Sequence, residues 1–250
     1  MVPVNADMKD PYRLLGVGLC LLGAAFAPLA YLILDSVPLT AVALSAIVIG
    51  IVCVALANTR PYISPEACQV LLKTGMENTA ALLEELGLKN KAVYLPSAMR
   101  DGQPQAIIPL EDKKAEFIPG KIPGRLIVRY GAGPDDMAIA VTTPGSISTE
   151  LLRSRPGPTS ASIEGAASYI LTGVLDLASS VTVNMTDGEV DVLVRGARLH
   201  FEDTRYQRCL GSPIASIVAA ICSEALGRPV RIGEEIHQRG EGHIKLEVLS

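Results

Sequence analysis

The densest group of side chains that can exchange protons lies near the C-terminus of the sequence. It consists of Glu234, Glu235, His237, Glu241 and His243. A carboxylate beside an imidazole can act in general acid–base catalysis or bind a polar ligand. Three glycines interrupt the stretch, and this pattern is also typical of a connecting turn, in which polar residues are the default. We therefore assign no catalytic residue and keep Glu235 and His237 as candidate ligand-binding residues.

A second candidate is the sequence Thr143-Pro144-Gly145-Ser146, which falls between an expected strand and an expected helix. Backbone N–H groups at a helix start can hold an anion, helped by the helix dipole. Thr143, Gly145 and Ser146 are therefore candidate ligand-binding residues. The alternative is plain capping, in which hydroxyl groups satisfy the free amides. The sequence contains no Walker lysine motif and no GxGxxG motif, so it predicts no nucleotide site.

Metal and cofactor chemistry find little support in the sequence. Residues 131–136 combine a Gly-Ala-Gly turn with two adjacent aspartates, which suits a solvated hairpin turn better than a calcium loop with its alternating acids. The five cysteines include no CxxC pair, and the spacing of His200, Cys209 and Cys222 matches no standard zinc site. We expect no metal site, no cofactor and a reduced compartment.

Composition separates the chain into two segments of very different character. The 250 residues are 49% hydrophobic and 19% charged, with a formal net charge of −4. Asp35 is the only charged residue between Arg13 and Arg60, whereas the sequence after Arg60 has ordinary soluble composition. These figures exclude a disordered chain, a small disulfide-stapled protein and a strongly basic nucleic-acid-binding module.

Two apolar runs, residues 14–34 and 37–57, predict a transmembrane helical hairpin over 14–57. Each is long enough to cross the hydrocarbon core of a bilayer as a helix. Lys9 and Arg13 precede the first run and Arg60 follows the second, while the turn between them has no basic residue. The positive-inside rule then places both termini, including residues 1–13, in the cytoplasm, as in a multi-pass protein of the cell membrane.

A cleaved signal peptide followed by a single anchor is the alternative to a hairpin. The first run is long for a signal peptide, and Pro28 directly follows the small-residue pattern that could serve as a cleavage site. Small residues recur at helical spacings in both runs, and these either pack the two helices together or support self-association. The candidate packing residues are Gly16, Gly23, Ala27, Ala46 and Gly50.

The soluble part divides at the Pro- and Gly-rich stretch 153–162 into two lobes, 64–152 and 163–250. Each lobe contains a helix followed by a pair of strands, so we expect an α+β fold with two αββ-containing lobes that share one layer of sheet. Helices are expected at 64–86, 163–177 and 214–226. The first should bury an apolar face made of Val70, Leu71, Ala81, Leu82 and Leu86. Strands are expected at 92–95, 105–110, 125–130, 137–142, 180–185, 189–194, 198–201, 229–232 and 243–249.

A resemblance accompanies this pattern. The two apolar runs, the stretch 86–96 (LGLKNKAVYLP), the stretch 106–110 (AIIPL), the Thr-Pro-Gly turn, and the stretches 211–216 (GSPIAS) and 225–230 (ALGRPV) resemble uncharacterised membrane proteins of archaea. The resemblance implies a membrane location and a cytoplasmic α+β domain. It implies no catalytic residue, cofactor or substrate.

These observations predict a membrane-anchored cytoplasmic scaffold, adaptor or accessory subunit that is oligomeric and non-catalytic. Its expected partners are the lipid bilayer and either a second copy of the chain or another membrane protein, and no nucleic acid. The alternative is a membrane-tethered sensor of a small ligand, or an enzyme, with a pocket between the two lobes.

Overall fold

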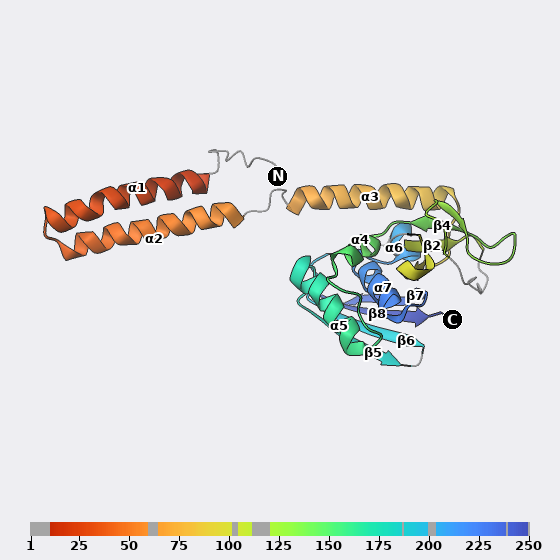
Figure 1. The fold of residues 1–250 in the computed structure, drawn as a ribbon. Coiled ribbons are helices and arrows are strands. Elements are labelled where there is room, and N and C mark those ends of the chain that lie inside the picture. The colour runs from red at the N-terminus through yellow and green to blue at the C-terminus, as the bar shows by residue number, and fades with distance from the viewer. Residues whose placement is uncertain are drawn as a thin grey trace. The chain divides into compact units, whose positions relative to one another are not determined.

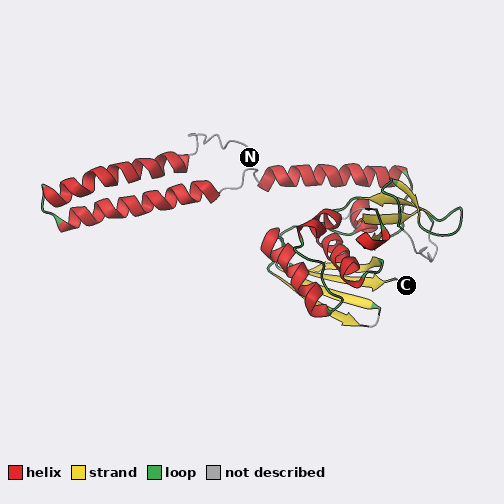
Figure 2. Cartoon of the chain, in the orientation of Figure 1, coloured by secondary structure: helices red, strands yellow, loops and turns green. Residues whose placement is uncertain are grey.

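Two long helices form the N-terminal part of the chain, α1 (Pro11–Leu32) and α2 (Val37–Thr59) (Figure 1). A computed structural model describes residues 11–59, 65–101, 105–111, 121–186, 188–199, 204–238 and 240–249. The chain splits into two compact units, Met1–Leu71 and Leu72–Ser250. The expected α+β class is confirmed, with two apolar helices preceding a domain built on an antiparallel sheet (Figure 2).

Small residues bring α1 and α2 into close contact. Gly16, Gly23 and Ala30 are buried in α1, and Ala43 and Gly50 are buried in α2, in both helices at intervals of seven residues. A Cβ atom at Gly16 would lie 2.7 Å from the backbone oxygen of Gly50. This heptad spacing suits a close, left-handed packing of the two helices.

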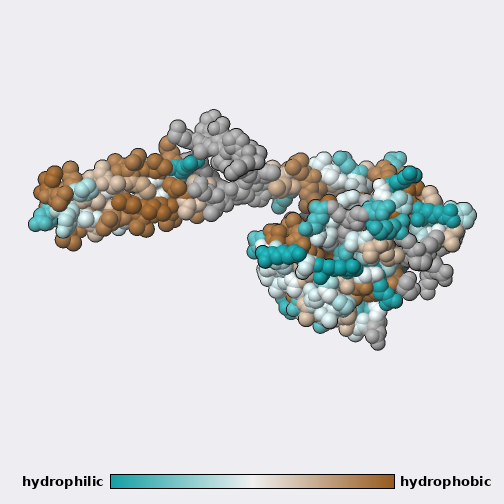
Figure 3. Space-filling model, in the orientation of Figure 1, coloured by the Kyte–Doolittle hydropathy of each residue, from teal (hydrophilic) through white to brown (hydrophobic). Residues whose placement is uncertain are grey.

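Of the five candidate packing residues in this hairpin, three are fully buried and two are half-buried. Gly16, Gly23 and Gly50 face the partner helix, whereas Ala27 and Ala46 are partly exposed. The large apolar side chains of both helices point outward instead (Figure 3). The small residues therefore serve the contact within the hairpin.

Within the described residues, three helical stretches are long and apolar enough to cross a membrane, Tyr12–Leu32, Val37–Ala57 and Arg205–Leu226. The three stretches differ in the share of their residues that is buried. In the most apolar windows of the first two, only 17% and 11% of residues are buried, against 94% in the third. The third stretch fills the interior of the sheet domain, whereas the first two leave most of their apolar surface without protein cover.

The second unit contains one eight-stranded antiparallel sheet with the order β3-β4-β2-β1-β7-β8-β6-β5. The pairing of β1 with β7, through Val93↔Arg231 and Tyr94↔Val230, joins strands from the two expected lobes into one layer. The strands are β1 (Val93–Leu95), β2 (Gln105–Pro109), β3 (Ile127–Arg129), β4 (Met137–Val141), β5 (Ser180–Thr186), β6 (Glu189–Arg195), β7 (Val230–Gln238) and β8 (Glu241–Val248).

Helix α7 (Pro213–Leu226) is the centre of the main core, and 13 of its side chains are buried. Ser212 caps its first turn and Gly227 ends it in the left-handed conformation at φ 65°. Side chains alternate across the strands: Tyr94 and Ile108 face α7, while Val93 and Ile107 belong to a smaller core on the opposite face. The other helical segments are α3 (Pro65–Glu85), η1 (Ser97–Met99), α4 (Pro144–Ser148), η2 (Thr149–Leu151), α5 (Ser160–Ser168), the π-helical turn η3 (Tyr169–Val174) and α6 (Arg205–Leu210).

The outer strand β5 has its open edge covered by side chains of α5. The backbone N–H of Val183 donates to Oε2 of Glu164 at 2.8 Å, and the carbonyl oxygen of Val183 accepts a hydrogen bond from the hydroxyl of Ser160. The backbone groups that an additional strand would use at this position are therefore already bonded.

Two sequence expectations about helices are wrong. The buried face of α3 is made of Met76, Ala80 and Leu83, whereas Leu82 and Leu86 are exposed. The buried set follows an i, i+4, i+7 spacing and lies on a different side of the helix from the predicted set. The expected helix 163–177 begins earlier as α5 and changes to a π-helical turn, and α6 was not expected at all.

Two strand expectations also differ from the structure. Residues 233–242 are not a connecting turn, because β7 continues to Gln238 and β8 begins at Glu241. The polar side chains there occupy an exposed extension of a two-stranded ribbon, where water can solvate them. The expected strand 198–201 is absent at residues 198–199, and its remaining residues lie outside the described chain.

Candidate ligand pocket

A pocket of about 370 Å³ lies where α6 and the start of α7 meet β7. Its volume falls in the lower part of the range of small-molecule sites. It contains two of the predicted ligand-binding residues, Glu235 and His237. The lining side chains are Lys91, Gln207, Arg208, Cys209, Gly211, Ile232, Glu235 and His237. We call it the α6–β7 pocket.

A β-bulge in β7 turns the two candidate residues toward this pocket. Ile232 pairs with Leu246 and Glu234 pairs with Lys245, so Gly233 is the extra residue. Beyond the bulge Glu235 lies opposite Ile244, which is buried on the helix-covered face. Without the extra residue the alternation would place Glu235 and His237 on the other face of the sheet.

Glu235 connects the strand to the first turn of α7. Its Oε2 accepts a hydrogen bond from the backbone N–H of Ser212 at 3.0 Å, and its Oε1 lies 2.6 Å from Nε2 of His237. A carboxylate at the positive end of a helix is favourable. The side chain of Glu235 is 14% exposed and that of His237 is 41% exposed, so the imidazole lies at the solvent side of the pair.

Gly211 permits this close approach. Its φ of 75° is in the left-handed region, and a Cβ atom there would lie 2.5 Å from Cδ1 of Ile232 and 3.4 Å from Oε2 of Glu235. The glycine before the helix cap thus leaves room for both the strand and the carboxylate.

Two cationic side chains complete the polar wall of the pocket. The ammonium group of Lys91 donates to the backbone oxygen of Gly233, in the bulge itself. Arg208 lies on the exposed side of α6. Two basic side chains therefore accompany a single carboxylate among the lining residues.

Cys209 lines the pocket but is poorly suited to act as a nucleophile. Burial raises the pKa of its thiol, against a smaller lowering by Arg205, and its Sγ donates to the carbonyl oxygen of Leu88 at 3.7 Å. The reactive form of cysteine is the thiolate, which this environment disfavours. The pocket is therefore better equipped to bind than to form a covalent intermediate at this sulfur.

The structure places Thr143, Gly145 and Ser146 at the start of α4, packed against α7. Thr143 and Ser146 form a reciprocal capping box, and the N–H of Gly145 donates to Oγ of Ser216 at 3.2 Å. A Cβ atom at Gly145 would lie 2.1 Å from the backbone oxygen of Ser216. The amides that an anion would need are thus bonded within the protein, so this geometry favours capping, and a ligand-binding role here stays a prediction.

Tyr94 lies in the buried layer that α7 covers, and it is held by a hydrogen bond. Burial raises the pKa of its phenol well above the usual value, and the neutral hydroxyl donates to the backbone oxygen of Leu210 at 2.5 Å. This bond fastens β1 to the end of α6, directly before Gly211. It is a second restraint on the segment that shapes the pocket.

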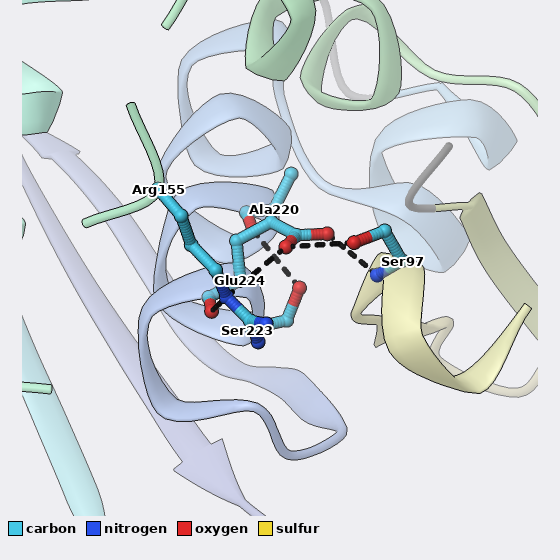
Figure 4. Close-up of polar contacts among 5 residues, drawn as sticks. All are labelled: Ser97, Arg155, Ala220, Ser223 and Glu224. Atoms are coloured by element: carbon cyan, nitrogen blue, oxygen red, sulfur yellow. Dashed lines mark hydrogen bonds and ion pairs between the residues drawn. The ribbon is translucent and has the colours of Figure 1, made fainter. Parts of the chain in front are cut away.

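A buried carboxylate, Glu224, fastens the other end of α7 (Figure 4). Its Oε1 accepts from the backbone N–H of Ser97 at 2.5 Å and its Oε2 accepts from the Ser97 hydroxyl at 3.0 Å. Nε of Arg155 lies 3.7 Å from Oε2 and donates to the Glu224 carbonyl oxygen at 2.8 Å. A negative charge at a helix C-terminus is unfavourable, so these donors offset its cost. The arrangement joins three chain segments.

Metal binding finds no support in the part of the chain that the structure describes. Those residues contain no group of three His, Cys, Asp or Glu side chains placed to hold an ion. Asp136 instead accepts a hydrogen bond from the N–H of Gly133 at 2.7 Å within the turn that connects β3 and β4. His200 lies outside the described residues, and Cys209 and Cys222 are free thiols.

The sequence did not single out Lys91, Gln207 or Gly211 as site residues. Lys91 and β7 are more than 130 positions apart, and no local pattern reports such a distant contact. A usable signal was the Gly211-Ser212-Pro213 helix start, because a glycine directly before a capped helix often allows close packing.

Comparisons with known proteins identify the family to which the chain belongs. No curated protein and no solved structure matches the chain. A family profile described as "Domain of unknown function (DUF7982)" matches residues 4–247, which include both the hairpin and the sheet domain. On this nearly complete match, the chain belongs to the DUF7982 family.

Proposed function

We propose that the protein is a membrane-anchored accessory or scaffold subunit, non-catalytic and oligomeric. The observation that carries the proposal is the distribution of side chains in the hairpin: small residues fill the α1–α2 contact and the large apolar side chains face outward. Such a surface is stable in lipid and costly in water. The lipid bilayer is then the first partner of the chain.

In this proposal both termini and the sheet domain lie on the cytoplasmic side of the cell membrane, which makes the protein multi-pass. The basic residues that flank the hairpin support that orientation. The free thiols of the sheet domain agree with a reducing compartment. No interaction with nucleic acid is proposed, because the net charge is −4.

The test is native mass spectrometry of the full-length protein released from detergent micelles. We expect a homo-oligomer or a complex with another membrane protein. Alkaline carbonate washing of membranes should leave the chain in the pellet. A monomer that co-purifies with no partner would contradict the scaffold proposal, and release by carbonate would contradict the anchor.

A second candidate function is a membrane-tethered sensor that binds a small ligand. The α6–β7 pocket favours it, because Glu235 and His237 converge there with Lys91 around one cavity. The same native mass spectra provide the test. A bound small molecule that is lost on Glu235→Ala substitution is the expected result, and an unliganded protein with an unchanged spectrum is the contrary one.

A further inference from the structure

We propose that the α6–β7 pocket binds a small phosphate or phosphomonoester group. The proposal rests on the second function above, ligand sensing, and adds the chemical class of the ligand. It is carried by the juxtaposition of Lys91, Arg208 and His237 around a cavity in which the one carboxylate among the described lining residues is already bonded.

The charges of the lining residues favour an anion. Glu235 is the single acidic side chain among the described lining residues, and each of its oxygens has a partner, His237 on one side and the N–H of Ser212 on the other. Lys91 and Arg208 supply two positive charges. Basic side chains therefore outnumber acidic ones among the described lining residues, and this balance favours an anion.

Hydrogen-bond capacity points the same way. The ammonium group of Lys91 has three donors, of which one is used by the carbonyl oxygen of Gly233. The side-chain amide of Gln207 adds further donors at the wall. A negatively charged group with several acceptor oxygens matches this surplus of donors, and phosphate is such a group.

A second pocket on the same pair of strands provides an internal contrast. It has a volume of about 440 Å³ and is lined by Glu189, Glu234 and Glu247 with a single Lys245. Glu234 is exposed and directly precedes Glu235, which faces the first pocket. The bulge at Gly233 thus separates a basic pocket from an acidic one, and only the basic one suits an oxyanion.

The experiment is titration of the full-length protein in detergent with inorganic phosphate, measured by isothermal calorimetry at constant ionic strength. Lys91→Met should weaken phosphate binding about tenfold. Lys245→Met is the matched control, because it removes an exposed lysine from the acidic pocket, and it should leave the affinity within about twofold. Circular dichroism confirms that each variant is folded.

If Lys91→Met does not fold, Arg208→Met replaces it, with a loss of affinity again expected at the basic pocket only. Absence of saturable phosphate binding to the wild-type protein overturns the proposal. An equal loss of phosphate affinity in Lys91→Met and Lys245→Met overturns it as well. Neither result contradicts the sensor function, because that function is tested separately by native mass spectrometry, which detects a co-purified ligand of any class.

The source of the phosphate group is decided in nanodiscs of phosphatidylcholine with and without phosphatidic acid. A lower apparent affinity for inorganic phosphate in the discs that contain phosphatidic acid identifies a lipid headgroup as the ligand. An equal affinity in both kinds of disc identifies a free phosphate or phosphomonoester.

Discussion

The hairpin and helix α7 have similar composition and opposite surroundings. The hairpin helices and the stretch Arg205–Leu226, which ends in α7, are all apolar enough to cross a membrane, yet the hairpin exposes its large side chains whereas α7 buries 13 of its residues under the sheet and the neighbouring helices. Both also use glycine for close contact, Gly16 against Gly50 in the hairpin and Gly145 against Ser216 beside α7. Hydropathy therefore identifies an apolar helix, and only the remainder of the fold decides whether protein or lipid covers it.

The sharpest test of this contrast places the same charge in both regions. Ile217→Asp puts a carboxylate at a position in α7 that is 1% exposed, and we expect it to lower the free energy of unfolding of the sheet domain by about 4 kcal/mol or more. Thermal unfolding followed by circular dichroism measures the loss.

The matched variant is Val48→Asp, at a position in α2 that is 60% exposed. It should leave the thermal midpoint of the sheet domain unchanged and reduce the fraction of protein in the membrane pellet, because an aspartate at the centre of a span costs about 3 kcal/mol. Equal melting of the domain in both variants would contradict the distinction between the two regions.

Gly145→Ala tests close packing beside α7. The new Cβ atom would lie 2.1 Å from the oxygen of Ser216, so α4 must move, and we expect a loss of about 3 kcal/mol in the free energy of unfolding. Gly165→Ala is the control, because nothing lies within 4 Å of a Cβ atom at that position in α5. It should be neutral or slightly stabilising in the same denaturant titration.

Glu224→Ala should have a smaller effect, about 2 kcal/mol. It leaves the N–H and hydroxyl of Ser97 without their partner at the end of α7, and unsatisfied buried polar groups are destabilising. Urea midpoints measure the effect. Ser97→Ala should cost about 1 kcal/mol, because it removes only the hydroxyl bond. If Glu234→Ala, on the exposed face of β7, were equally damaging, the importance of the buried contact would be refuted.

Near pH 9, the smallest expected effect concerns thiols. Burial raises the pKa of Cys222 in α7 to about 12, whereas an unfolded cysteine ionises near 8.5. Between these values the unfolded chain releases the proton and the folded chain keeps it, so stability should fall as pH rises, by at most about 1.4 kcal/mol per pH unit. Cys222→Ala should flatten the fall in thermal midpoint above pH 9.

Alkylation at pH 8 gives an independent readout of the same burial. Exposed Cys68 should react with iodoacetamide, and Cys222 should react only after unfolding. Modification of Cys222 in the folded protein at the rate of Cys68 would show that α7 is not enclosed. Peptide mass mapping distinguishes the two cysteines.

The α+β class and most strands could be predicted because they depend on local patterns. Val190, Val192 and Val194 alternate along β6, and Ser212-Pro213 marks the start of α7 regardless of distant contacts. The extension of β7 through residues 234–238 could not be predicted, since polar side chains in an exposed ribbon resemble those of a turn. The buried face of α3 could not be predicted either, because the side chains of Met76 and Ala80 are no more apolar than those that this helix leaves in solvent.

The candidate site was predicted in part, for a similar reason. Glu235 and His237 stood out by residue type, but their direction depends on one extra residue at Gly233, which reverses the face of everything after it. Lys91 is brought to them by the pairing of β1 with β7, and that pairing has no signature in the sequence near either strand.

The bonds that α5 makes to Val183 have a consequence for the membrane anchor proposed above. Anchoring would raise the local concentration of sheet domains, and an open outer strand under such crowding invites edge-to-edge polymerisation. Because Glu164 and Ser160 occupy the backbone groups of Val183, growth of the sheet past β5 is blocked at that point. In the proposed oligomer, copies of the chain would then meet through surfaces other than this part of the β5 edge.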